Sequence, residues 1–277
     1  MHCLRLGLMG ALAFLPALAQ VSSVPPAQSS TEKIAPHQLG PIHDKLDHFD
    51  GTADSTNWSG YAVLGSSFTS AEASWVVPTT NCSGVRGDQY AAFWVGLDGY
   101  SSSTVEQTGT LSYCAGRNPG YYAWFEFYPN PMYEITGLTV APGNRISASV
   151  VYKGGTTFTV TITNESTGQS YSTSSTVSGA ARSSAEWIVE APCCTNSGGI
   201  LPLADFGTGL LGYDSTGISG TNYATDSTTS GPIGGSIGFP SADIEEINKV
   251  GSRTSPQTST CSALSSDGTS FSCTWAQ

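Results

Sequence analysis

The feature that most limits how this chain can fold is a series of short segments, from Asn57 to the C-terminus, in which apolar and polar residues alternate. Alternation at every second residue is typical of strands with one buried face, and the 3.6-residue period of helices is almost absent. Many short strands at this spacing predict an all-β sandwich or barrel. The expected strands are 60–63, 72–77, 91–98, 105–110, 121–128, 146–152, 157–164, 170–177, 185–190, 203–206, 244–250 and 270–275. Residues 207–240, rich in Gly, Ser and Thr, are expected to form long loops with at most one irregular strand.

The first nineteen residues have the pattern of a secretory signal peptide. Arg5 precedes an apolar run from Leu6 to Leu18, and Ala17-Leu18-Ala19 fits a cleavage site. The run is too short to span a bilayer, and no later stretch is long enough. We therefore expect a secreted monomer with no membrane partner.

Residues 20–52 form a segment rich in Pro, Ser and Gln with no hydrophobic period. It is either a linker or a pro-segment removed on activation. His37, His43 and His48 all lie here, and histidine gains its charge near pH 6.5. These histidines favour a pro-segment released at acid pH, followed by one domain over residues 53–277.

The cysteines agree with export, because Cys3 leaves with the signal peptide and an even number remains. Cys261 and Cys273 flank a hairpin-turn signal, which predicts a disulfide between them. A second bond, between Cys82 and Cys114, is expected without such a signal. The adjacent Cys193 and Cys194 have no explanation in the sequence.

The chain carries a net charge of −11, yet only 11% of its residues are charged. A sparse acidic surface is unsuited to nucleic acid or anionic lipid. It suits an acid medium, because few ion pairs are lost when carboxylates become protonated. An ordinary solvated extracellular surface would look the same, so composition alone does not decide between the two.

Three expected strands carry aromatic rings and carboxyl groups on the face opposite their apolar residues. A solvated sheet face more often shows Thr, Ser and Lys, so this face is typical of a binding cleft. Packing against a loop or a second sheet is the alternative. The residues concerned are Trp94 and Asp98, then Tyr122, Trp124, Glu126 and Tyr128, then Glu186, Ile188 and Glu190.

Residues 53–277 contain no histidine, which excludes Ser-His-Asp and Cys-His catalysis and zinc sites built on histidine. No pair of aspartic-protease loops and no calcium-loop signature is present, so we expect no metal and no cofactor. Carboxyl groups remain as the catalytic candidates. Glu186 and Glu190 lie about 13 Å apart at strand rise, too far for the carboxyl pair of a glycosidase. Other carboxyls could form such a pair, so this class is weakened and not excluded.

Several motifs in order resemble the glutamic peptidases, or eqolisins. The matching segments are Asn57-Trp58-Ser59-Gly60, Trp94-Val95-Gly96-Leu97-Asp98-Gly99, Gln107-Thr108-Gly109, Trp124-Phe125-Glu126-Phe127-Tyr128-Pro129 and Ala185-Glu186-Trp187-Ile188-Val189-Glu190. The resemblance implies a sandwich of two large, bent antiparallel sheets of the lectin-like (concanavalin A) kind. It also implies an acid endopeptidase acting on protein and peptide substrates.

The same resemblance implies roles for individual residues. Gln107 and Glu190 occupy the positions of the catalytic pair. Trp94 and Asp98 match residues beside that pair, Trp58 and Trp124 match aromatic residues of the cleft, and Glu126 belongs to the same substrate-binding group. The sequence departs from the family where Ser101 to Ser103 replace a cysteine and where Cys193-Cys194 replaces an acidic stretch, which leaves the disulfides and the pocket shape open.

Peptide hydrolysis needs an activated water, a stabilised oxyanion and a proton for the leaving amine. Glu190, ionised above roughly pH 4, could take the proton from water and pass it on. The Gln107 amide could orient the water and donate to the oxyanion. The alternative function is a lectin-like carbohydrate-binding sandwich without catalysis, which would account for the aromatic face but not for the Gln and Glu motifs.

Overall fold

The computed structural model describes residues 32–193 and 199–277. The expected signal peptide and Cys194 lie outside these residues. These described residues belong to one compact unit. Within the described residues, no helix is long and apolar enough to cross a membrane.

The unit is built almost entirely of short strands. In chain order they are β1 (Glu32–Ile34), β2 (Leu46–Asp47), β3 (Thr52–Ser55), β4 (Trp58–Leu64), β5 (Ser70–Val76), β6 (Asp88–Leu97), β7 (Val105–Ala115), β8 (Asn118–Tyr128), β9 (Tyr133–Ile135), β10 (Arg145–Gly154), β11 (Thr157–Asn164), β12 (Gln169–Thr176), β13 (Ser184–Glu190), β14 (Thr208–Gly212), the helix α1 (Tyr213–Thr216), β15 (Tyr223–Thr225), β16 (Ser230–Pro232), a 3-10 turn at Ser241–Asp243, β17 (Ile244–Lys249), β18 (Thr258–Cys261) and β19 (Ser270–Ala276).

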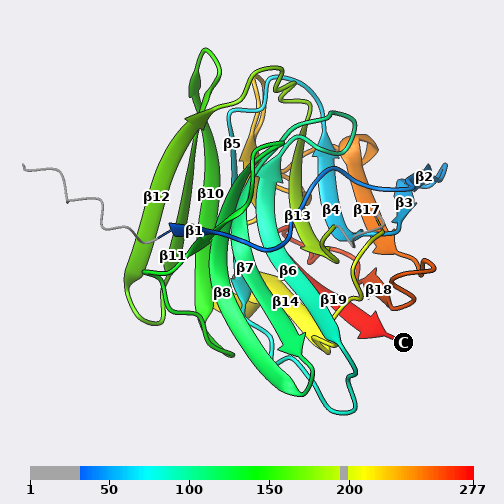
Figure 1. Ribbon diagram of the computed structural model, residues 1–277. Helices are drawn as coiled ribbons and strands as arrows, with labels where there is room; N and C mark the ends of the chain where they lie inside the picture. The colour runs from blue at the N-terminus through cyan, green and yellow to red at the C-terminus, as the bar shows by residue number, and fades with distance from the viewer. Residues whose placement is uncertain (1–31, 194–198) are drawn as a thin grey trace, which may run out of the picture. The chain divides into compact units, whose positions relative to one another are not determined.

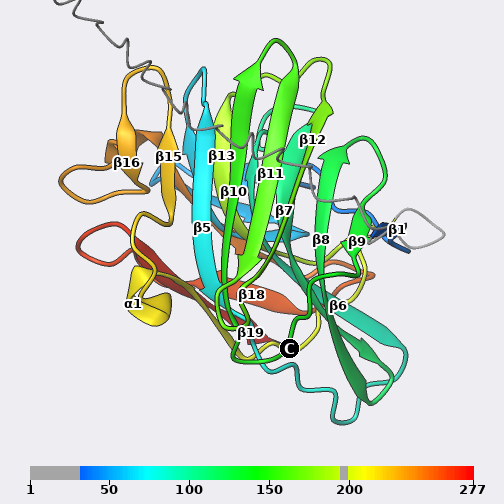
Figure 2. The same cartoon turned by 90° about the vertical axis from the view of Figure 1, so that its left-hand side faces the viewer.

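The strands form two layers that are joined along one side. In the first layer the hydrogen-bonded order is β1-β9-β8-β7-β6-β13-β4-β17, and all of these pairs are antiparallel. In the second the order is β19-β14-β5-β10-β11-β12, with β15 and β16 extending from β5 (Figure 2). Strand β18 pairs with both β17 and β19 and so links the layers. The expected sandwich of antiparallel sheets is therefore confirmed.

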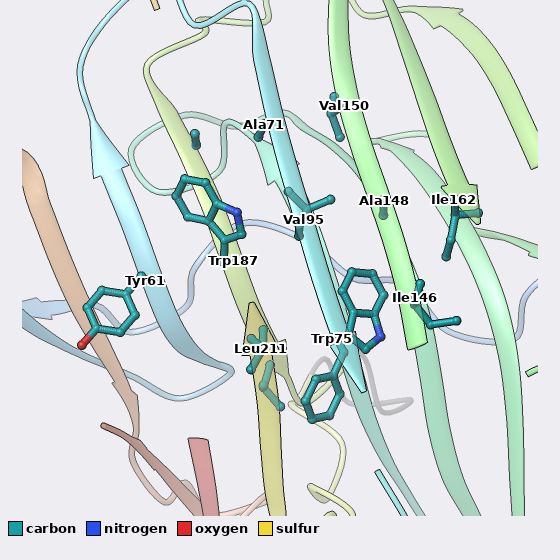
Figure 3. Close-up of a cluster of buried hydrophobic side chains, with 14 of the residues drawn as sticks. Tyr61, Ala71, Trp75, Val95, Ile146, Ala148, Val150, Ile162, Trp187 and Leu211 are labelled. Atoms are coloured by element: carbon teal, nitrogen blue, oxygen red, sulfur yellow. The ribbon is translucent and has the colours of Figure 1, made fainter. Parts of the chain in front are cut away.

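The main hydrophobic core fills the space between the two layers (Figure 3). Trp75 of β5 and Trp187 of β13 are fully buried in it. A buried indole N–H needs an acceptor, and each finds one: Trp75 donates to the Thr110 hydroxyl at 2.9 Å and Trp187 to the Glu72 carbonyl at 2.8 Å. The two rings therefore fix the spacing between layers through hydrogen bonds as well as through packing.

Two sequence expectations about the C-terminal half were wrong. Residues 203–206 form no strand, because Leu203 joins the sheet only through a single bridge to Tyr90. Residues 207–240 were expected to be long loops, but they contain β14, α1, β15 and β16. The Gly, Ser and Thr content of this region predicted loops, but tertiary pairing overrides it. Strand β14 is hydrogen-bonded on both sides, to β19 and to β5.

The two predicted disulfides are present. Cys82 is bonded to Cys114, and Cys261 is bonded to Cys273 across the β18–β19 hairpin. Cys193 is also disulfide-bonded. Disulfides of this kind form and persist in oxidising compartments.

A carboxyl group lies in the interior at the start of β7. Glu106 is fully buried, and burial raises its pKa from 4.5 to about 9, with a further contribution from the charge of Asp98. The folded chain therefore binds this proton more tightly than the unfolded chain does. The stability that this proton confers is complete below about pH 4.5 and is lost as the pH rises toward 9.

We expect the free energy of unfolding to fall as the pH rises, and Glu106→Gln to reduce that fall. Between about pH 5 and pH 7, Glu106 alone accounts for up to about 3 kcal/mol. Urea unfolding at both pH values measures this, with Glu165→Gln, an exposed carboxyl, as the matched control. Equal pH dependence in Glu106→Gln and the parent protein would show that Glu106 titrates normally.

Candidate active site

The outer face of the first layer carries a second hydrophobic cluster, separate from the main core. Trp94, Trp124 and Ile188 belong to this cluster, whereas their strand neighbours Phe93 and Val189 belong to the main core. The two faces predicted from strand alternation are therefore confirmed. The face is not open, because the chain that precedes β4 covers it, as the blue segment crossing the strands in Figure 1 shows.

Glu190, the last residue of β13, is fully buried in this face. Its Oε2 atom accepts the Trp94 indole N–H at 3.0 Å, and its Oε1 atom accepts the Asn57 amide at 3.1 Å. The backbone N–H of Gly40 faces the same carboxyl. Burial raises the pKa of Glu190 well above its usual value, although these hydrogen bonds oppose the shift. The expectation of ionisation above roughly pH 4 therefore does not apply to this covered form.

Gln107 and Glu126 face each other across the β7–β8 pair. Both are fully buried, and the Gln107 Nε2 atom donates to the Glu126 Oε2 atom at 3.0 Å. The same carboxylate oxygen accepts the backbone N–H of Leu39 at 3.2 Å. Burial, followed by the charge of Glu190, raises the pKa of Glu126 well above its usual value. Glu126 is therefore a neutral acid when the medium is acidic.

Trp94 lies between Glu190 and Gln107, because neighbouring glycines leave room for its ring. A Cβ atom at Gly96 would lie 2.7 Å from the Trp94 ring, and one at Gly109 would lie 2.1 Å from the Phe93 carbonyl and 2.7 Å from the Trp94 Cβ. Gly96 pairs with Gln107, so the ring covers the sheet beside the glutamine while its N–H reaches Glu190. Trp94 thus connects the two predicted catalytic residues.

The remaining predicted residues divide into two groups. Trp58 packs edge-on against Trp94 with ring centroids 5.0 Å apart, and Trp124 is fully buried in the same cluster. Asp98 instead accepts the backbone N–H groups of Arg182 at 2.7 Å and Ser183 at 2.9 Å. Asp98 therefore fixes the turn that leads into β13, and within the described residues no hydrogen bond joins it to Gln107 or Glu190.

Asn57 belongs to the site, although the sequence identified it only as part of a motif. It is fully buried, and its amide nitrogen donates to Glu190 and to the Pro41 carbonyl. Its Oδ1 atom accepts the His43 backbone N–H at 2.8 Å. Asn57 therefore joins Glu190 to the covering segment. No pattern in the sequence indicates that the Asn57 side chain makes these contacts.

Carboxyl groups, amides and indoles make up this site. Within residues 32–193 and 199–277, no group of three or more His, Cys, Asp or Glu residues is placed to hold a metal ion. The chemistry that these side chains can supply is proton transfer by a carboxyl group and hydrogen bonding by an amide.

Comparisons with known proteins point to one family. Residues 56–275 match the Peptidase A4 family. The chain is 28% identical to aspergillopepsin-2 of Aspergillus niger over 229 residues, which are 75% of this chain and 76% of that protein. It is 35% identical to scytalidopepsin B of Scytalidium lignicola over 167 residues, which are 57% of this chain and 61% of that protein. The crystal structure of scytalido-glutamic peptidase with a transition state analog inhibitor has a TM-score of 0.63 and 25% identity, covering 80% of this chain and 98% of that chain.

Asn57→Ala should loosen the covering segment. The His43 amide loses its acceptor, so we expect its hydrogen exchange to become about tenfold faster, in line with one lost hydrogen bond. Site-resolved hydrogen exchange measures this, with the exposed Asn130→Ala as control. Unchanged exchange at His43 would contradict the role given to Asn57.

Proposed function

Since the chain belongs to the Peptidase A4 family of glutamic peptidases and is thus a peptide-bond hydrolase, we propose that Glu190 and Gln107 carry out the hydrolysis. The observation that carries this proposal is the position of Trp94. Its indole N–H donates to Glu190, and its ring packs on the sheet beside Gln107. A carboxyl group and an amide then face the same bound peptide. A carbohydrate-binding sandwich is not favoured, because the family match is to peptidases.

Glu190 acts first as a base and then as an acid. In its ionised form it takes a proton from a water molecule, which attacks the peptide carbonyl carbon. The resulting carboxylic acid then gives this proton to the leaving nitrogen. The donors from Trp94 and Asn57 stabilise the ionised form against the effect of burial, so the carboxyl can alternate between its two states.

Gln107 stabilises the negative oxygen that forms during the attack. Its amide N–H groups donate without titrating, so they stay donors at every working pH. In the covered form one of them is bonded to Glu126. The buried Glu126 side chain thereby holds the Gln107 amide in a fixed orientation, which reduces the reorganisation needed during the reaction.

Residues 20–52 are proposed to be an inhibitory pro-segment of a secreted zymogen. The described part of this segment lies over the catalytic face, with Leu39 fully buried there. His37 packs edge-on against Tyr90 at 4.3 Å, and burial lowers its pKa although the charge of Asp88 raises it. The covered state therefore disfavours a proton on His37, and its stability decreases as the pH falls below the usual histidine pKa.

Glu190→Gln should lower casein hydrolysis at acid pH by about 10²–10⁴-fold, because glutamine cannot accept the proton. Gln107→Ala should lower it by about 10²–10³-fold, and the double variant should be little worse than Glu190→Gln. Glu186→Gln is the matched control, a buried glutamate on the same face of β13. Full activity of Glu190→Gln would exclude Glu190 as the base.

A synthetic peptide of residues 32–52 should inhibit the processed enzyme in initial-rate measurements. The matched control is the same peptide with Leu39→Asp, which should inhibit far less because a charge would enter the apolar cluster. Equal inhibition by the two peptides, or by neither, would contradict a segment that binds in the site through Leu39.

A further inference from the structure

We propose that the covering segment presents its own Leu39–Gly40 peptide bond to Glu190 and Gln107 as a substrate, and that this bond is the first one cleaved on activation. The inference rests on the proposed function and extends it. It assigns the subsites on either side of the cleaved bond, with an enclosed aliphatic residue before it and a small residue after it.

Two consecutive backbone N–H groups carry the argument. The Leu39 N–H donates to Glu126, the carboxyl that also accepts the Gln107 amide. The next N–H along the chain, that of Gly40, faces the Glu190 carboxyl, and Asn57 donates both to that carboxyl and to the carbonyl of the following Pro41. The carbonyl carbon of Leu39 lies between these two nitrogens in the covalent chain. This carbon therefore lies between Glu126, which binds the proposed oxyanion donor Gln107, and the proposed base Glu190.

The orientation of the peptide fits the chemistry. The nitrogen that contacts Glu190 is the one that must receive a proton when the Leu39–Gly40 bond breaks. In a trans peptide the carbonyl points opposite to the N–H of the following residue. The Leu39 carbonyl thus points away from Glu190, as is needed for an oxyanion that a different group stabilises.

The main chain is anchored on both sides of this bond. After it, the Trp58 indole donates to the Gly40 carbonyl at 3.1 Å and the Asn57 amide donates to the Pro41 carbonyl at 3.2 Å. Before it, the Gln38 N–H donates to the Cys193 carbonyl at 3.0 Å. Contacts of this kind hold an extended peptide whatever its side chains are.

Two side-chain positions are selective. Leu39 is fully buried in the cluster that contains Trp94 and Trp124, so this subsite takes an apolar residue. A Cβ atom at Gly40 would lie 3.3 Å from the Tyr128 ring, which is tighter than ordinary contact. A larger residue at this position requires Tyr128 to move, so the subsite after the cleaved bond favours glycine.

The step balances as an ordinary hydrolysis. A water oxygen bonds to the Leu39 carbonyl carbon, and the bond from that carbon to the Gly40 nitrogen breaks. One proton of the water passes through Glu190 to the nitrogen. The products are a new carboxyl group on Leu39 and a new amino group on Gly40.

The test is acidification of the purified full-length chain, followed over time by mass spectrometry of the new termini. We expect the earliest products to end at Leu39 and to begin at Gly40, and we expect Glu190→Gln to stay intact. Gly40→Leu should slow this cut by at least about tenfold, and Tyr128→Ala should restore it in the Gly40→Leu background. Circular dichroism checks that each variant is folded.

A second measurement does not depend on folding of the variants. Quenched fluorescent peptides with the sequence of residues 36–43 are given to the processed enzyme, with Gly40 kept or replaced by Leu. We expect the glycine peptide to be cleaved at least about tenfold faster, at the bond after Leu39. Equal or faster cleavage of the leucine peptide would overturn the assignment of the subsites.

The two proposals can fail separately. If the acidified chain digests casein but its first cut lies elsewhere than Leu39–Gly40, the inference is wrong and the proposed function stands. If neither casein nor the chain itself is cleaved at acid pH, the proposed function fails and the inference fails with it.

Discussion

The burial of the Glu190 carboxyl is the constraint on which the rest of the site depends. A carboxyl group removed from water must find hydrogen-bond donors within the protein. Trp94 and Asn57 supply them, the Gly40 N–H faces the same carboxyl, and each of the three fixes another part of the structure. Trp94 needs glycines beneath its ring, Asn57 orders the chain before β4, and Gly40 holds the covering segment against the sheet. The outer face of the first layer and the segment that covers it are thus built around one group.

The covering segment controls protonation as well as access. Glu126 and Glu190 each have a raised pKa, mainly because the segment and the sheet exclude water from them. Two neighbouring carboxyls in such a place are stable when neutral, since ionising one raises the pKa of the other. Departure of the segment admits water and lowers both pKa values toward their usual range. The covered form therefore excludes other substrates, because its own segment fills the site.

The sequence predicted those parts of the structure that follow from local periodicity. Alternation identified most strands and put Trp94 and Glu190 on one face, because successive strand residues point to opposite sides. Contacts between distant segments were not predictable in this way. Asn57 is hydrogen-bonded to Glu190 although the two lie 133 residues apart in the sequence, and Leu39 is hydrogen-bonded to Glu126 across 87 residues. Neither pair leaves a pattern in a single sequence, and composition indicated only that residues 20–52 differ from the domain.

Recognition through the main chain explains how one site could hold its own segment and also accept other proteins. Trp58 and Asn57 donate to backbone carbonyl groups, which every peptide has. Selection is then limited to the enclosed position of Leu39 and the narrow position beside Tyr128. The segment gains its advantage over other peptides from being part of the same chain, because an attached ligand needs no encounter in solution. That advantage ends when the bond at the site is cut, since the freed piece must then compete at its actual concentration. A segment held as a substrate can therefore inhibit strongly while intact and weakly after a single cleavage.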